Sequence, residues 1–149
     1  MLTISDLFHL DDTIAASLFA GKTYPWEGLE GLSAYILQLG ATLSPEEFDH
    51  LGGPCIIDHG AEIRHGAFIR GSAIVGKKAV VGNSVELKNV VLFDGVQVPH
   101  YNYVGDSVLG SHAHMGAGSI TSNVKSDKTL VVIRAGEERI PTGRKKVGA

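Results

Sequence analysis

A six-residue period in the apolar residues dominates the middle of this sequence. Aliphatic side chains recur at every sixth position from Ile57 to Leu87, and a second apolar residue follows each of them four positions later. The first set is Ile57, Ile63, Ile69, Val75, Val81 and Leu87, and the second is Ala61, Ala67, Ala73, Ala79, Val85 and Val91. Neither the 3.6-residue period of a helix nor the alternation of a single strand produces this spacing. The period is typical of a hexapeptide β-helix, in which short strands wind around a triangular prism.

The period divides the chain into three segments. Residues 1–52 lack it and carry helical patterns, residues 53–128 carry the hexads, and residues 129–149 follow once the pattern has faded. The boundary, Gly52-Gly53-Pro54, disfavours regular structure. We therefore predict a mainly β fold, a parallel β-helix with a small N-terminal helical cap. A last strand at residues 129–133 is expected to lead into a solvated tail, which could also pair with a neighbouring subunit.

The N-terminal segment predicts three short helices. Asp11 and Asp12 are placed to cap the first, Pro25 starts the second, and a capping box from Ser44 to Glu47 starts the third. By the logic of terminal capping repeats, we expect these helices to cover one open end of the β-helix. The alternative, a domain that binds a partner or substrate, has no motif in its support. There is no glycine-rich phosphate loop either, so we expect no complete nucleotidyltransferase.

After Leu87 the period becomes irregular. The interval shortens to five residues between Leu87 and Leu92, and again between Val104 and Leu109. Such a slip either tightens one corner of the prism or makes the segment loop outward, and loops often carry binding sites.

The composition of the 149 residues excludes several classes of protein. The formal net charge of −3 provides no strong field for nucleic acid or for a membrane surface, so neither is expected as a partner. The single Cys55 excludes an internal disulfide and fits a reducing compartment. No apolar run is long enough to span a bilayer, and no basic-then-apolar signal peptide opens the sequence. We expect a cytoplasmic protein.

Two basic residues fall one full coil apart. Three hexads make one coil, so residues 18 apart are expected to stack on one face, about 4.8 Å from each other. Arg70 and Lys88 have this spacing, and both follow an inward aliphatic residue, so their side chains point outward. Two neighbouring cations are favourable when a phosphate bridges them, because arginine offers a planar fork and lysine a point charge. The alternative is a solvated surface on which Glu62 or Glu86 neutralises the two cations.

Polar and aromatic residues interrupt the hexads at Pro99-His100-Tyr101-Asn102-Tyr103. A histidine can act as a general base near neutral pH, so His100 is a candidate catalytic residue. The alternative is a corner histidine with an ordinary hydrogen bond. Four more histidines raise the further alternative of a zinc site with carbonic-anhydrase-like chemistry, namely His59, His65, His112 and His114. Their spacing matches no established ligand pattern, so we predict no metal.

Four segments carry a resemblance to a known family. They are Phe68–Arg70, Gly82–Lys88, His100–Asp106 and Gly116–Asn123. In sequence and in spacing, this block of roughly 55 residues resembles the acetyltransferase domain of bacterial bifunctional N-acetylglucosamine-1-phosphate uridyltransferase/glucosamine-1-phosphate acetyltransferase, of the hexapeptide-repeat transferases. The resemblance implies a left-handed β-helix that assembles as a homotrimer, with active sites between subunits and acetyl-CoA as co-substrate.

The resemblance also implies roles for individual residues. Arg70 and Lys88 would bind the phosphate of a hexosamine 1-phosphate, and Tyr103 would contact the same phosphate. His100 would be the general base that takes a proton from the amino group of the sugar, after which the amine attacks the thioester of acetyl-CoA. Asn123 would help to hold the sugar, and we count it with His100 as catalytic.

Two further positions complete the set that the resemblance implies. His114 stands where the family has an asparagine, and we assign it to substrate binding. Ala117 lies in the segment whose backbone approaches the acetyl end of the donor, so it is the cofactor-binding residue.

The sequence departs from the family on the donor side. The aromatic residue expected after Asn123 is Val124. Only a short segment follows Lys128 before the sequence stops at Ala149, whereas the family continues there with the coils that form the coenzyme A groove. We therefore expect an incomplete donor site, either in a fragment of a longer protein or in a homologue with impaired acetyl transfer.

Two hypotheses for the function follow. The leading one is a sugar-phosphate acyltransferase in nucleotide-sugar synthesis, which uses the residues that the resemblance assigns. The alternative is a non-catalytic module that binds phosphosugars or drives trimerisation.

Overall fold

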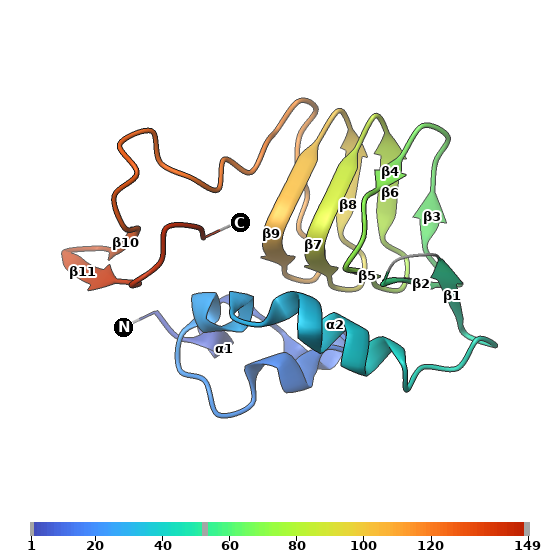
Figure 1. Cartoon of the computed structure of the whole chain (residues 1–149), viewed down its shortest axis with the longest axis horizontal. Coiled ribbons are helices and arrows are strands. Elements are labelled where there is room, and N and C mark those ends of the chain that lie inside the picture. The colour runs from blue at the N-terminus through green and yellow to red at the C-terminus, as the bar shows by residue number, and fades with distance from the viewer. Residues whose placement is uncertain (1, 52–53, 148–149) are drawn as a thin grey trace.

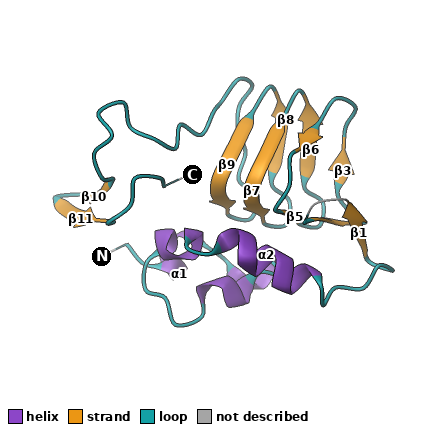
Figure 2. Ribbon diagram, in the orientation of Figure 1, coloured by secondary structure: helices purple, strands orange, loops and turns teal. Residues whose placement is uncertain are grey.

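The computed structural model describes residues 2–51 and 54–147, so the boundary predicted at Gly52-Gly53 lies outside the described residues. Parallel strands stack in successive coils to form a β-solenoid, with a helical segment along one side and a hairpin near the C-terminus (Figures 1 and 2). The predicted mainly β fold, with parallel coils and a small N-terminal cap, is confirmed.

The strands of the solenoid fall on three faces. One sheet has the order β1-β2-β5-β7-β4, with β9 paired to β7, and the other has the order β3-β6-β8. The bounds are β1 Phe48–Leu51, β2 Cys55–Asp58, β3 Glu62–Ile63, β4 Phe68–Ile69, β5 Ala73–Val75, β6 Val80–Asn83, β7 Glu86–Leu92, β8 Gln97–His100 and β9 Tyr103–Leu109. The longer β7 and β9 each bend round a corner, so their first halves continue the face of β4 and their second halves that of β5. The pairs between successive coils are parallel, whereas β1 pairs antiparallel with β2 at the first coil.

The aliphatic residues of the six-residue period form columns inside the prism. Ile69 lies beside Leu87, and Leu87 beside Val104, on one face. The other faces carry the columns Ile57–Val75–Leu92–Leu109 and Ile63–Val81–Val98. Eight of these ten side chains are buried, whereas Ile69 is partly buried and Ile63 is 38% exposed, so the period marks the hydrophobic core.

The corners of the prism are turned by residues in the left-handed region of φ. Ser72, Lys78, Ser84, Asn89 and Tyr101 are five of the non-glycine residues with φ between 48° and 57°. The predicted five-residue slips fall at such corners. In the first coil, two residues, Gly71 and Ser72, turn this corner. In each of the next two coils a single residue turns it, first Asn89 and then Asp106. The slips therefore tighten a corner, and the segment does not loop outward.

The tightened corners change the length of a coil. Ile57 pairs with Val75 across three complete hexads, but Val75 pairs with Leu92 across a coil that is shorter. The expected stacking at three hexads therefore applies only to the first coil, because each tightened corner removes a single residue.

The N-terminal cap lies along a side of the solenoid and not over an open end. Its elements are α1 Ile4–Leu7, the 3₁₀ turns η1 Leu10–Asp12, η2 Ala16–Phe19 and η3 Pro25–Leu29, and α2 Leu32–Gly40. Helix α2 contacts β5 and β7, and η3 contacts β9. Phe8 joins the two layers, with its ring centroid 5.0 Å from that of Phe19 and 5.3 Å from that of Phe93 in the solenoid. In the part of the chain that the structure describes, none of the helices has the length and apolar character to cross a bilayer.

The predicted helices are only partly present. The second one breaks at Gly31, whose φ of 67° is left-handed, so that η3 and α2 are separate elements. The third prediction is wrong. The chain makes one turn after Ser44, and Phe48 then enters β1, where it is buried and pairs with Asp58.

The C-terminal residues fold back and are not a simple solvated arm. Strands β10, Val132–Ala135, and β11, Glu138–Pro141, form an antiparallel hairpin, so the last strand begins later than predicted. Beyond it, Arg144 donates to the Glu30 carboxylate at 2.8 Å, between η3 and α2. The tail is thereby tied to the N-terminal segment.

Candidate functional site

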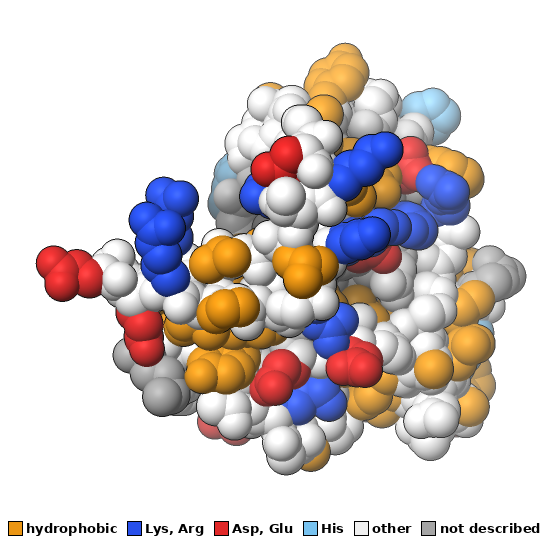
Figure 3. All heavy atoms as spheres, turned by 60° about the vertical axis from the view of Figure 1, so that its left-hand side comes forward, with side chains coloured by type: hydrophobic (Ala, Val, Ile, Leu, Met, Phe, Trp, Pro, Cys, Tyr) orange, Lys and Arg blue, Asp and Glu red, His pale blue; other side chains and the backbone are white. Residues whose placement is uncertain are grey.

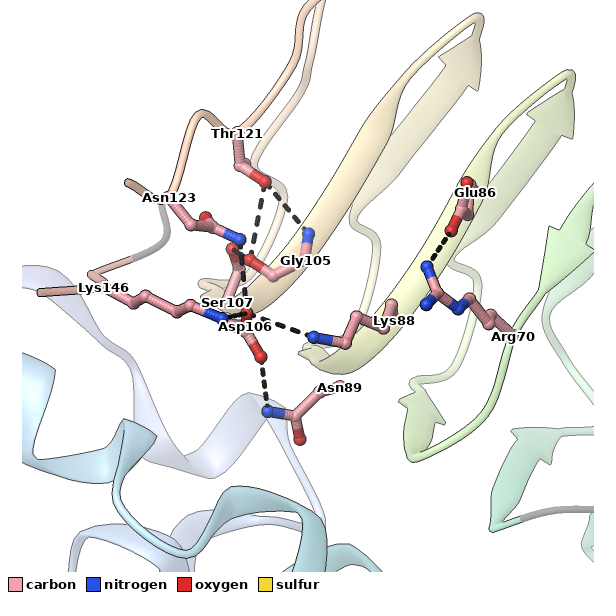
Figure 4. Close-up of polar contacts among 10 residues, drawn as sticks. All are labelled: Arg70, Glu86, Lys88, Asn89, Gly105, Asp106, Ser107, Thr121, Asn123 and Lys146. Carbon is pink, nitrogen blue, oxygen red and sulfur yellow. Dashed lines mark hydrogen bonds and ion pairs between the residues drawn. The ribbon is translucent and has the colours of Figure 1, made fainter. Parts of the chain in front are cut away.

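A ladder of polar side chains follows one corner of the solenoid. Asn89 and Asp106 turn the two tightened corners, and Asn123 follows at the same interval of 17 residues. Asn89 Nδ2 donates to Asp106 Oδ1 at 2.9 Å, and Asn123 Nδ2 to Asp106 Oδ2 at 3.4 Å (Figure 4). The left-handed φ values of 55° at Asn89 and 48° at Asp106 suit these residue types, whose short polar side chains tolerate that region.

The two predicted cations lie beside this corner. Ile69 pairs with Leu87, so the residues that follow them, Arg70 and Lys88, stack on neighbouring coils of one face. Lys88 Nζ lies 3.5 Å from Asp106 Oδ2, from which the side chain of Arg70 is farther away in Figure 4. The structure thus places both cations as their three-hexad spacing predicts.

Carboxylates accompany both cations. Arg70 donates to Glu86 Oε1 at 3.0 Å, so Glu86 neutralises one of the two cations as foreseen, whereas Lys88 pairs with Asp106. The same role foreseen for Glu62 is wrong, because Glu62 pairs with Arg64 at 2.7 Å. The side chain of Arg70 is 55% exposed, so this pair is worth little in water and leaves the guanidinium accessible.

A hollow of about 470 Å³ opens at the two cations. It is lined by Ser33, Pro54, Arg70, Gly71, Ser72, Lys88, Asn89 and Asp106. Ser33 comes from α2 and its hydroxyl lies 2.6 Å from that of Ser72, so the hollow lies where the helical segment meets the solenoid corner. Its volume falls within the range of small-molecule sites. A larger hollow of about 730 Å³ lies in the N-terminal segment and holds none of the predicted site residues.

Tyr103 is the third predicted phosphate contact, and Gly105 determines where its ring lies. In β9 Tyr103 pairs with Glu86, and Gly105 pairs with Lys88. A Cβ on Gly105 would overlap the Tyr103 hydroxyl, so the phenol lies across Gly105. The outward column of Arg70 and Lys88 is therefore continued by a hydroxyl group. We assigned no role to Gly105 from the sequence.

His100, His114 and Ala117 lie on a different face. His100 ends β8, and His114 pairs with Gln97 of the same strand. Ala117 lies next to Gly118, whose N–H donates to the His100 carbonyl at 3.1 Å. All three residues are exposed. Within one chain, the structure brings Arg70, Lys88, Tyr103 and Asn123 together around one face and its corner, and it separates them from the two histidines.

Asn102 fixes the backbone of His100, and sequence reasoning missed it. The side chain of Asn102 is buried, with 2% exposure, and its Oδ1 accepts the His100 N–H at 3.1 Å. Its Nδ2 donates to the carbonyls of Gly116 at 2.8 Å and Ser119 at 3.2 Å. Among the described residues the His100 imidazole has no hydrogen-bond partner, so its backbone is held while its ring remains accessible. An inward-pointing asparagine at a corner was the available signal.

Two other kinds of chemistry find no support in the structure. Burial raises the pKa of the Cys55 thiol to about 11, so this thiol stays protonated near neutral pH and is a poor nucleophile. Across residues 2–51 and 54–147, no three His, Cys, Asp or Glu side chains form a group that could hold a metal ion.

Hexads wound into a parallel solenoid define the class of hexapeptide-repeat proteins. The chain belongs to the family of the GMPPB C-terminal domain, whose family model matches residues 51–134, more than half of the chain.

Curated relatives match part of the chain. The chain is 49% identical over 76 residues to the bifunctional protein GlmU of Cereibacter sphaeroides, covering 51% of this chain and 16% of that protein. It is 41% identical over 66 residues to a bifunctional sugar-1-phosphate nucleotidylyltransferase/acetyltransferase of Sulfurisphaera tokodaii, covering 44% and 16%. It is 36% identical over 62 residues to the GlmU of Methanococcus aeolicus, covering 42% and 15%. The chain thus spans about one sixth of the length of the relatives that it matches, and its resemblance to bifunctional GlmU proteins is confirmed over that part.

Proposed function

We propose that this domain binds a hexosamine 1-phosphate and transfers an acetyl group from acetyl-CoA to its amino group. The observation that carries the proposal is the stacking of Arg70 and Lys88 on neighbouring coils at the mouth of the 470 Å³ hollow. A phosphate monoester carries up to two negative charges, and a guanidinium next to an ammonium matches it well. The names of the relatives, which include sugar-1-phosphate and acetyltransferase activities, support the same chemistry.

The face beside the hollow suits the acceptor. The Tyr103 hydroxyl continues the column of Arg70 and Lys88, and the amide of Asn123 lies at the corner next to it. In this proposal the two cations and the phenol hold the phosphate. Asn123 then donates to a sugar hydroxyl with the Nδ2 hydrogen that Asp106 does not accept, because its Oδ1 is buried.

The reaction needs a base, and His100 is the proposed one. Its neutral imidazole takes a proton from the ammonium of the amino sugar, and the amine lone pair then attacks the thioester carbonyl of acetyl-CoA. A C–N bond forms, the C–S bond breaks, and coenzyme A leaves as a thiolate that takes up a proton. Ala117 lies next to His100, and the exposed His114 lies on the same face beside Gln97, where we propose that the donor and the sugar meet.

The test is acetyl-CoA turnover with glucosamine 1-phosphate, followed by release of the coenzyme A thiol. We expect His100→Ala to lower kcat about 100-fold with little change in KM, because it removes only a proton acceptor. Arg70→Ala should raise KM for the sugar phosphate about tenfold. His65→Ala is the matched control, since His65 is also an exposed histidine of the solenoid and has no assigned role. Absence of turnover with any amino-sugar phosphate and acyl-CoA would refute the enzyme hypothesis.

A non-catalytic phosphosugar-binding module is the second candidate. It is favoured by the position of His100, which lies on another face than the hollow and has no partner for its imidazole among the described residues. This candidate predicts binding of glucosamine 1-phosphate without binding of acetyl-CoA. Calorimetric titration with each ligand separates the two candidates, because acetyl transfer requires both to bind.

A further inference from the structure

The C-terminal tail returns a distant cation to the candidate site. The Val131 N–H donates to the Arg144 carbonyl at 2.8 Å, and the Arg144 guanidinium is held by Glu30. Further along the tail, Lys146 forms an antiparallel bridge with Val124, next to Asn123 in the polar ladder. Val147 lines an apolar hollow together with Trp26 and other residues. These contacts bring Lys146 Nζ to 3.9 Å from Asp106 Oδ2.

Asp106 is the carboxylate that both lysines share. Its Oδ2 lies 3.5 Å from Lys88 Nζ and 3.9 Å from Lys146 Nζ, and the ammonium groups approach it from different sides in Figure 4. Its Oδ1 accepts from Asn89 at 2.9 Å, which is its shortest contact. The side chain is 17% exposed, so its charge is poorly solvated and depends on these partners.

The position of Asp106 creates a difficulty for a phosphate. Asp106 lines the hollow, whereas Lys146 does not. A carboxylate there repels an incoming phosphate and competes with it for Lys88. A second cation on the far side of Asp106 offsets both effects, because it compensates the carboxylate when Lys88 turns to the phosphate. On the side of the molecule shown in Figure 3, several Lys and Arg side chains lie close to one another, with Asp and Glu side chains among them.

We propose that Lys146 is a positioning residue that acts as the counter-ion of Asp106 and so leaves the charge of Lys88 available to a phosphate. The inference rests on the proposed function, because it takes the hollow as the phosphate site. Lys146 does not touch the phosphate and acts through Asp106. The tail is then a working part of the acceptor site, although it lies outside the hexads.

The first test is calorimetric titration of the full chain with glucosamine 1-phosphate and with inorganic phosphate. We expect Lys146→Gln to weaken binding of both about fivefold, and Lys146→Arg to restore it. Lys145→Gln is the matched control, because it removes the same charge from an exposed neighbouring residue without a contact to Asp106. Equal effects of the two glutamine variants, or tighter binding in Lys146→Gln, would overturn the inference.

The second test separates the counter-ion role from a merely structural one. Asp106→Asn keeps the shape of the side chain and removes its charge, so in this background Lys146→Gln should no longer alter phosphate affinity. A full fivefold effect that persists there would show that Lys146 acts independently of Asp106, which contradicts the inference. If the wild-type chain binds neither ligand, the proposed function fails and this inference fails with it. If the wild type binds and Lys146→Gln is unchanged, only this inference fails.

Discussion

Gly82 occupies a point in the solenoid where neighbouring coils leave no room for a side chain. It lies in β6, and a Cβ added there would overlap the backbone of Pro99 in β8. We predict that Gly82→Ala destabilises the fold by about 3 kcal/mol, because the neighbour is main chain and cannot rotate away. Urea denaturation monitored by circular dichroism measures the change.

Gly116 provides the control for Gly82. It falls in the same outward column of the β3-β6-β8 face, but the nearest atom to an added Cβ is Ser119 Oγ at 3.8 Å. Gly116→Ala should therefore change stability by less than about 0.5 kcal/mol. If both variants lose the same stability, the overlap at Gly82 is not the cause.

At the scale of single residues, the site residues that could be predicted from the sequence are those that stack three hexads apart across the first coil. Arg70 and Lys88 are three hexads apart, and their stacking follows from counting hexads. Asn89 and Asp106 were missed because each stands alone at a tightened corner, and from there on the coil is 17 residues long. Counting by this shorter interval from the first slip would have connected Asn89, Asp106 and Asn123. The buried Asn102 follows the inward Val98 by four residues, where the period places a small apolar side chain, so the asparagine itself was the signal. Its role was missed because it depends on the turn that Asn102 holds.

Element η3 begins with a charged cap that makes its stability depend on pH. Glu27 accepts the backbone N–H groups of Tyr24 at 2.8 Å and Thr23 at 2.7 Å, and these hydrogen bonds lower the pKa of its carboxyl below the usual 4.5. A lowered pKa means that the folded state favours the ionised form. The stabilisation is therefore present above pH 4.5 and is lost as the pH falls through the folded pKa.

The expected result of Glu27→Gln follows from this sign. The variant should melt at a lower temperature than the wild type at pH 7, because the amide keeps one acceptor but loses the charge. The difference should shrink as the pH falls below 4.5. Thermal melts at pH 7 and pH 3 measure it, with Glu46→Gln as control, since Glu46 is an exposed glutamate outside this cap. A pH-independent difference would mean that the charge of Glu27 plays no part.

The elements of the solenoid were more predictable than those of the cap. Each hexad repeats one local environment, so the six-residue period identifies strands, corners and inward positions together. The capping box at Ser44 is a local signal only. No helix forms there, because Phe48 is buried in β1, which pairs with the first coil. The break at Gly31 follows from its left-handed φ of 67°, which a glycine adopts without strain. A tertiary contact decided the outcome at Ser44, and no local pattern records it.

For the whole molecule, the resemblance implies a homotrimer, and the solenoid exposes a surface that suits one. Phe68 is 59% exposed and Ile120 is 66% exposed, both at outward positions of the face that carries Tyr103. We predict that the protein sediments at three times the 15.8 kDa of one chain, and that Phe68→Asp dissociates it. Leu37→Asp is the control, because Leu37 is 55% exposed on α2, away from that face. A wild-type chain that sediments as a monomer would contradict the prediction.

The prism was predictable at the scale of the molecule, whereas the arrangement around it was not. The period gives the parallel coils, but it carries no information on where a non-repetitive segment docks, so the cap was placed on an open end and not along β5 and β7. The return of the tail to Glu30 was missed for the same reason. The left-handed winding and the homotrimer were predicted from the resemblance alone, because the six-residue period does not distinguish a left-handed from a right-handed β-helix.

The short sequence distance between neighbouring coils has a consequence for the order of folding. Most ladder pairs in the solenoid join residues that are a single coil apart, so a coil can form on its neighbour at a small cost in loop closure. The contact between Arg144 and Glu30 joins residues 114 apart and needs both ends of the chain in place. We therefore expect the coils to assemble first and the tail to dock last. Lys146 would then reach Asp106 only in the closing step, and the newly folded chain would pass through a stage in which the corner is built but its charges are unbalanced.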